Sequence, residues 1–152
     1  MCGISGSGKT YYARQLEKAG YIRLSSDALI WEKVGEDPAG LPKAEKRQLF
    51  AECRRQMLHR LVELLKEGKK VVVDATFCHR AARDEIRELC GALGVEPDFV
   101  YCHADKEELW RRLSQRKGAD PDDLKVSREE LAEYWHGFEH PREDETDFLD
   151  PF

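Results

Sequence analysis

The chain has 152 residues, of which 41% are hydrophobic and 36% are charged, and its formal net charge is −5. A chain of this length predicts a single domain, residues 1–152, that buries its own core. The negative net charge argues against a protein that coats long DNA, although a local basic groove would be compatible with it.

Cysteine content and hydropathy indicate the compartment. The five cysteines are odd in number and form no C-x-x-C pair, so the sequence predicts neither a disulfide framework nor a zinc site. No run of about 18 apolar residues is present, and no charged and then apolar leader precedes the first motif. We therefore expect a cytoplasmic protein with reduced thiols and no membrane contact.

Hydrophobic periodicity and the positions of Gly and Pro predict helices that alternate with strands. The pairs Asp105 with Glu108 and Ser127 with Glu130 resemble capping boxes at two helix starts. In chain order, the expected elements are a helix at 9–19, a strand at 21–24, a helix at 27–34, a long helix at 43–67, a strand at 70–74, a helix at 80–93, a strand at 98–102, and helices at 105–116 and 127–138.

The run Val71–Val73 indicates a strand that is buried on both faces, as in a parallel sheet. Helices alternating with such strands predict an α/β fold with a mainly parallel sheet of about four or five strands. Only Met1 and Cys2 precede the first motif, and a strand needs about 4–6 residues, so we expect either that the natural chain starts upstream or that the first strand is truncated. Residues 146–152 could begin a final strand, which Pro151 disfavours.

Residues 3–10 match the phosphate-binding pattern G-x-x-x-x-G-K-[ST] at every position. Glycines let the backbone bend around an anion, successive N–H groups form a nest, and the following helix adds its positive end. We expect Lys9 to reach the β- and γ-phosphates of ATP and the Thr10 hydroxyl to bind Mg²⁺. The alternative is a flexible Gly/Ser turn before a helix. The predicted nucleotide-binding residues are Gly3, Ser5, Gly6, Ser7, Gly8, Lys9 and Thr10.

Two acidic residues follow predicted strands. Ligands of doubly wound sheets bind at the carboxyl ends of strands, so Asp27 is placed to accept a proton from an attacking hydroxyl. The alternative is that Asp27, Ser25 or Ser26 only caps the next helix. Asp74 ends the valine strand and is predicted to hold Mg²⁺, directly or through water.

A basic run marks a predicted lid region at residues 109–127. Arg112 and Arg116 are four residues apart on one predicted helix face, just before a loop with Gly and Pro. Arginines there can close over ATP and stabilise the charge on the transferring phosphoryl group, so we predict both to be catalytic. The alternative is a solvated basic face that pairs with Glu107 and Glu108.

Weaker signals stay open. The long helix carries arginines off its apolar face, which indicate a solvent-facing stripe more than an anion site. His79 could line a pocket near Asp74, and Trp31 could cover an acceptor site or fill the core. The acidic segment 139–152 reads as a solvated face or a loose tail. The arginines of the long helix that lie off its apolar face are Arg47, Arg54, Arg55 and Arg60.

These motifs together resemble the small P-loop kinases of the zeta-toxin and polynucleotide-kinase type, often described as AAA-family ATP-binding proteins. The resemblance covers nearly the whole chain and implies a nucleotide-kinase-like P-loop NTPase fold with three α/β/α layers. The acceptor-activating Asp of that family falls on Asp27. The stretch that begins at Asp74 looks like its D-A-T-N-x-x-x-x-x-R segment, which implies substrate binding by Thr76 and Arg83. Its two lid arginines fall on Arg112 and Arg116.

Two positions depart from that family. Phe77 stands in place of the Asn after D-A-T, and Ile30 in place of an Arg that holds substrate phosphate in polynucleotide kinases. Both changes favour a less charged acceptor. The sequence therefore predicts an enzyme that transfers the γ-phosphoryl group of MgATP to a hydroxyl of a small molecule or nucleotide. A 5′-hydroxyl polynucleotide kinase and an ATP-dependent switch are the alternatives.

Overall fold

The computed structural model describes residues 1–149, in which two pairs of parallel strands form the sheet. Strand β1 (Ile22–Ser25) pairs in parallel with β2 (Val71–Asp74). Strand β3 (Phe99–Val100) pairs in parallel with β4 (Phe148–Leu149). The expected final strand therefore forms at 148–149, and the rest of that expectation, at 150–152, lies outside the described residues.

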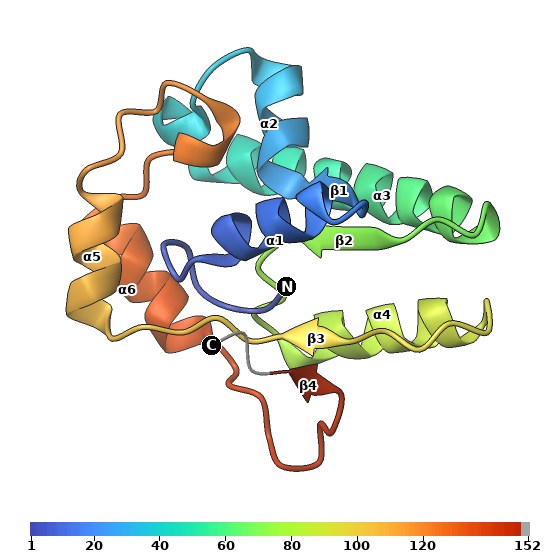
Figure 1. Cartoon of the computed structure of the whole chain (residues 1–152). Coiled ribbons are helices and arrows are strands. Elements are labelled where there is room, and N and C mark those ends of the chain that lie inside the picture. Colours follow the sequence, from blue (N-terminus) through green and yellow to red (C-terminus); the bar gives the residue numbers. More distant parts are fainter. Residues whose placement is uncertain (150–152) are drawn as a thin grey trace.

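The N-terminal residues join the two strand pairs. The Met1 ammonium donates a hydrogen bond to the carbonyl of Val73 at 2.9 Å. The Cys2 N–H donates to the Val100 carbonyl, and the Cys2 carbonyl accepts from the Cys102 N–H, both at 2.8 Å. The N-terminus thus lies between β2 and β3 (Figure 1). The predicted parallel pairing is confirmed, and Cys2 adds a single parallel bridge, to Tyr101.

Every expected helix is present, with small changes at the ends. The largest difference is at α5, which ends three residues before the predicted end at 116, because Ser114 already serves as its C-terminal cap. Figure 1 shows α5 and α6 beyond the carboxyl ends of the strands. The helices are α1 (Lys9–Lys18), α2 (Ser26–Val34), α3 (Lys43–Lys66), α4 (Arg80–Gly91), α5 (Lys106–Leu113) and α6 (Arg128–Gly137), with short 3₁₀ helices η1 (Pro38–Gly40) and η2 (Pro121–Asp123).

The valine run explains the layering. Val72 packs with Ala13 of α1 in one buried cluster. Val71 and Val73 point to the opposite face and pack against a cluster built largely from α3 and α4. Successive strand residues alternate between faces, so a continuous apolar run is needed where both faces are covered. The result is a helix layer on each side of the sheet.

The two expected capping boxes differ. At α6 the box is complete, because Ser127 accepts from the Glu130 N–H and Glu130 accepts from the Ser127 N–H. At α5 only half of it forms, because Asp105 accepts from the Glu108 N–H at 2.8 Å. The Glu108 carboxylate instead bonds the arginines of its own helix.

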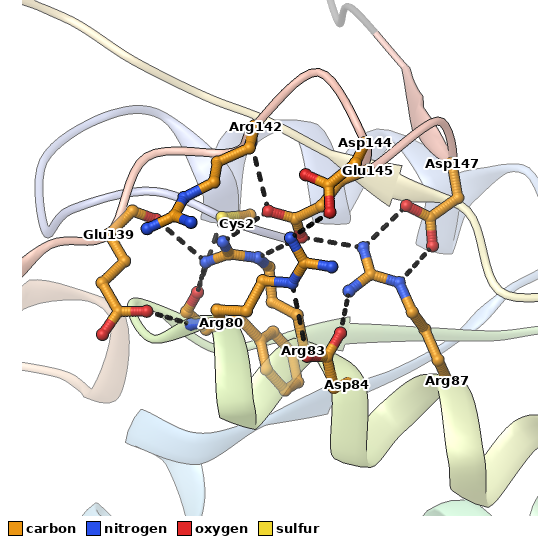
Figure 2. Close-up of polar contacts among 11 residues, drawn as sticks. Cys2, Arg80, Arg83, Asp84, Arg87, Glu139, Arg142, Asp144, Glu145 and Asp147 are labelled. Carbon is orange, nitrogen blue, oxygen red and sulfur yellow. Dashed lines mark hydrogen bonds and ion pairs between the residues drawn. The ribbon is translucent and has the colours of Figure 1, made fainter.

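The acidic C-terminal segment is not a loose tail within the described residues. Arg83 and Glu145 are fully buried side chains that form a two-bond ion pair, with both N–O distances at 2.8 Å. Arg87 also bonds Glu145 and Asp147. Figure 2 shows this network between α4 and the returning chain. The expectation of a solvated segment is wrong for Glu145 and Asp147, which the arginines of α4 neutralise, whereas Glu139, Glu143 and Asp144 are exposed as expected.

Acid should weaken this network. Arg83 and then Arg87 bond to Glu145 and lower its pKa to about 2, from an ordinary 4.5. Stability from a depressed carboxyl pKa is complete above the unfolded value and is lost as pH falls towards the folded value. We expect about 3 kcal/mol of unfolding free energy to disappear between pH 5 and 2 through Glu145. Urea unfolding of wild type and of Glu145→Gln at pH 5 and at pH 2 measures this loss of unfolding free energy.

The exposed Glu96→Gln variant is the control and should keep the wild-type pH dependence. If Glu145→Gln loses as much stability on acidification as wild type does, the ion pair does not carry this effect.

Candidate active site

The cradle at residues 3–10 has the backbone that a phosphate nest requires. Gly3, Gly6 and Gly8 have φ angles of 145°, 85° and 103°, a region that favours glycine. A Cβ on Gly3 would lie 2.2 Å from the Cys102 carbonyl oxygen, so a side chain is also excluded by space. Helix α1 begins at Lys9, within the cradle, so its positive end faces the same point.

Lys9 is buried at the base of this cradle. Its Nζ donates to the Ile4 carbonyl at 3.0 Å, which holds the side chain across the loop. Burial lowers the pKa of Lys9, while Asp74 and Asp27 oppose that shift. The two carboxylates therefore help to keep the ammonium charged where an anion would bind.

A cavity of about 250 Å³ opens above the cradle and brings most of the predicted residues together. We call it the cradle cavity. Gly3, Ser7 and Arg83 do not line it, and Ser7 lines another cavity instead. Predicted site residues that line the cradle cavity are Ser5, Gly6, Gly8, Lys9, Thr10, Asp27, Asp74, Thr76, Arg112 and Arg116.

A second cavity, of about 450 Å³, adjoins the first. We call it the apolar cavity, because aliphatic and aromatic side chains form most of its wall. Asp27, Thr76 and Arg116 line both cavities, so they stand at the junction. The apolar wall includes Ile30, Phe50, Met57, Phe77, Leu124, Val126, Tyr134 and Phe138, and the polar groups include Lys46, Arg54, His79 and Glu133.

Asp27 is free of the capping role that was its alternative. Ser25 is the N-cap of α2 and accepts from the Ala28 N–H at 3.2 Å. Ser26 Oγ donates to Asp27 Oδ1 at 3.3 Å. Burial raises the pKa of Asp27, and the Lys9 ammonium opposes that shift. A carboxylate with a raised pKa at a cavity junction is suited to accept a proton.

The two lid arginines reach the site by different routes. Arg112 donates to the Gly6 carbonyl at 3.0 Å and to Glu108 at 2.6 Å, so the expected pairing with Glu108 and the contact with the cradle coexist. Arg116 lies beyond the end of α5 and donates to the Leu124 carbonyl at 2.9 Å. The predicted helical spacing therefore does not hold, yet both side chains line the cradle cavity.

Arg23 was not predicted to belong to the site. Its guanidinium donates to Asp74 Oδ2 from Nε at 3.0 Å and from an Nη at 2.7 Å. The same guanidinium donates to Asp122, in the loop that follows α5. Burial opposes the charge of Arg23, but these bonds raise its pKa above the ordinary value. The sequence signal that could have pointed to Arg23 was the presence of a charged residue inside a short predicted strand.

Phe77 adopts an unusual backbone at the cavity wall. Its φ of 44° lies in the left-handed region, where a bulky residue costs about 1–2 kcal/mol. The fully buried Arg83 donates to the Phe77 carbonyl at 3.1 Å and so holds this turn. The structure therefore does not bring Arg83 to either cavity, and its predicted substrate contact is not part of our proposal.

The structure places the residues with weaker sequence signals in two different surroundings, a cavity wall and a core cluster. Arg54 and His79 line the apolar cavity, whereas Trp31 packs beside Ile30 and Cys53 in a core cluster. Tyr134, which helical patterning alone assigns to packing, also lines the apolar cavity, and burial raises its pKa to about 12.

Thr10 and Asp74 offer hard oxygen ligands beside the cradle, and such ligands fit Mg²⁺. Within residues 1–149, no cluster of three His, Cys, Asp or Glu side chains forms another metal site. No helix in that part of the chain is long and apolar enough to cross a membrane. All five cysteines lie in it as free thiols.

A family model described as an AAA domain matches residues 1–141. The chain belongs to the AAA domain family. A curated relative of this AAA domain, UPF0200 protein PAE1629 of Pyrobaculum aerophilum, is 27% identical over 128 residues, which are 84% of this chain and 70% of that protein.

Solved structures place this AAA domain among the P-loop kinases in fold. A candidate kinase from Chloroflexus aurantiacus has a TM-score of 0.77 at 20% identity, covering 98% of this chain and 83% of that chain. A gluconokinase from Sinorhizobium meliloti 1021 has a TM-score of 0.66 at 24% identity, covering 98% and 78%. An APS kinase from Mycobacterium tuberculosis, in complex with AMPPNP and APS, has a TM-score of 0.55 at 21% identity, covering 90% and 93%.

Proposed function

We propose that this AAA domain is a kinase that transfers the γ-phosphoryl group of MgATP to a hydroxyl group of a small molecule or nucleotide. The observation that carries the proposal is the position of Asp27 at the junction of the cradle cavity and the apolar cavity. A phosphate donor in one cavity and an acceptor in the other would meet at this carboxylate.

The cradle supplies the donor site. Backbone N–H groups of residues 5–10 and the Lys9 ammonium bind the β- and γ-phosphates. Thr10 and Asp74 would hold Mg²⁺, which neutralises charge on the phosphates when bound. Arg112 and Arg116 reach over the same cavity and stabilise negative charge on the transferring group.

Asp27 acts on the acceptor. It orients the acceptor hydroxyl and takes its proton as the oxygen–phosphorus bond forms to the γ-phosphorus. The bond between the γ-phosphorus and the β,γ-bridging oxygen breaks, and ADP leaves. Positioning and charge carry most of this catalysis, because protein groups make no covalent bond to the phosphoryl group.

The apolar cavity supports an acceptor with little charge near its reacting hydroxyl. Ile30 and Phe77 stand where the resembling polynucleotide kinases carry polar groups, and both line this cavity. Lys46 is paired with Glu130, and Arg54 with Glu85, so neither cation is left without a counter-ion. A volume of about 450 Å³ matches the size range of small-molecule sites.

ADP release with a panel of acceptors tests the proposal. The panel holds nucleosides, sugars, nucleotide-sugars, antibiotics and 5′-hydroxyl oligonucleotides. We expect one small-molecule class to stimulate release, and Lys9→Ala to reduce that release by about 10²–10³-fold, because the ammonium contacts charge that grows in the transition state. Release driven only by oligonucleotides, with a steep loss at high salt, would favour polynucleotide kinase activity.

ATP binding with no acceptor-stimulated release by any member would count against a transferase and would favour the switch. In that case Asp27→Asn should leave every measured property unchanged.

A further inference from the structure

Arg23 is the one guanidinium in the described chain that bonds both Asp74 and the loop after α5. It lies on β1, whose neighbour β2 ends at Asp74, and its side chain is 11% exposed. Asp74 is 4% exposed and Asp122 is 15% exposed as side chains. Three partly or fully buried charges from three separate segments therefore meet at one point.

The contact with Asp74 is selective for one oxygen. Both donors of Arg23 bond Oδ2, and within residues 1–149 no hydrogen bond is formed to Oδ1. This fixes the rotation of the carboxylate and leaves Oδ1 for the cradle cavity, which Asp74 lines. Charge-assisted bonds from a planar guanidinium hold such an orientation better than a single ammonium does.

The contact with Asp122 holds the loop. Asp122 lies in η2, and its Oδ1 and Oδ2 accept from Arg23 at 2.5 and 3.2 Å. Arg14 of α1 bonds Asp122 from outside, with a side chain that is 55% exposed. The following residues, 124–126, line the apolar cavity. Asp122 thus ties to β1 the segment just before this part of the cavity wall, which is also held by Arg116 at the Leu124 carbonyl and by Asp37 at the Lys125 N–H.

We propose that Arg23 is a positioning residue that latches residues 117–126, the loop of the predicted lid region 109–127 and called the lid below, to the metal-binding edge of the sheet. It presents Asp74 Oδ1 to the metal and, through Asp122, holds the lid closed over the acceptor. The metal half of this inference rests on the proposed function. The lid half rests only on the ion pairs.

Four variants test the metal half and the lid half of this inference independently. Arg23→Met removes both contacts, and Arg23→Lys keeps a charge beside Asp74 but lacks the planar fork that makes two bonds to each carboxylate. Asp122→Asn weakens only the lid contact. Arg14→Gln is the matched control, because Arg14 bonds Asp122 without touching Asp74.

Two measurements are made on the full chain. The first is the affinity for a fluorescent ATP analogue. It is expressed as the magnesium ratio, which is the affinity measured with Mg²⁺ divided by the affinity measured with EDTA. The second is the rate of tryptic cleavage at Lys117 and Lys125 of the lid under native conditions. A merely structural role of Arg23 would change thermal stability but not the magnesium ratio.

We expect Arg23→Met and Arg23→Lys to lower the magnesium ratio about tenfold and to raise lid cleavage about tenfold, as the loss of charge-assisted bonds predicts. Asp122→Asn should raise lid cleavage by a similar factor and leave the ratio near wild type. Arg14→Gln should leave the ratio unchanged and alter cleavage less than Asp122→Asn does.

An unchanged ratio in both Arg23 variants would overturn the metal half, and so would a higher ratio, which would show that Arg23 competes with the metal. Wild-type lid cleavage in Asp122→Asn would overturn the latch. If Arg23→Met does not fold, Arg23→Lys decides the same question. Failure of wild type to bind the analogue would instead defeat the proposed function, and lid cleavage would still test the latch.

Discussion

Replacement of Asp27 by Asn should lower turnover by about 10²–10⁴-fold, the usual contribution of a positioned general base. Asn keeps the size of the side chain and its place at the start of α2, but it cannot take the acceptor proton. ATP affinity should not weaken, because the change removes a negative charge from the edge of a phosphate site. Steady-state ADP release and analogue titration measure the two effects.

The control is Asp98→Asn, an exposed position beside the amino end of β3, which should keep wild-type turnover. The pH profile adds a second check. Since burial raises the pKa of Asp27, wild-type turnover should fall with acidification at a higher pH than an ordinary aspartate would give. Full turnover in Asp27→Asn would refute the assignment of Asp27 as base.

Replacement of Arg83 by Met should destabilise the protein by about 3–5 kcal/mol, because it leaves the buried Glu145 carboxylate without its main partner. It also removes the donors to the carbonyls of Phe77 and Glu139. The free energy of unfolding of a typical domain is about 5–15 kcal/mol, so this loss would be a large part of the total stability. Urea unfolding at pH 7 measures the change.

The double variant Arg83→Met with Glu145→Gln should recover part of that loss, since no unpaired charge is then buried. Arg60→Met serves as the surface control: within residues 1–149 Arg60 pairs with Glu63 alone, on the exposed side of α3, so its cost should stay below about 1 kcal/mol. A loss in Arg83→Met as small as that of Arg60→Met would contradict the importance of the buried pair.

Local sequence signals predicted the parts of this fold that depend on local physics. The glycines of the cradle, the valine strand and the box at Ser127 each specify a backbone conformation within a few residues, and each is present. Their positions after predicted strands, together with the family resemblance, pointed to Asp27 and Asp74, and the structure brings both to the cradle cavity.

Long-range pairing was the part that local patterns could not supply. The bond from Arg23 to Asp122 spans 99 positions, and the pair of Arg83 with Glu145 spans 62. Nothing within a few residues of Arg83 distinguishes a substrate-binding guanidinium from one that a distant carboxylate buries. The spacing of arginines on α4 was visible, but its meaning depended on where the acidic segment returns.

The position of Met1 and Cys2 between β2 and β3 has a consequence for the order of folding. Their partners, Val73 and residues near Val100, are separated from them by more than 70 positions. During synthesis the cradle sequence emerges before the strands that it contacts, and it cannot take its place until the chain has grown past Cys102. Such distant contacts slow folding, because loop closure must precede the contacts that reward it. The phosphate cradle, whose neighbours in the sheet come more than 70 positions later, should therefore be among the last features to form.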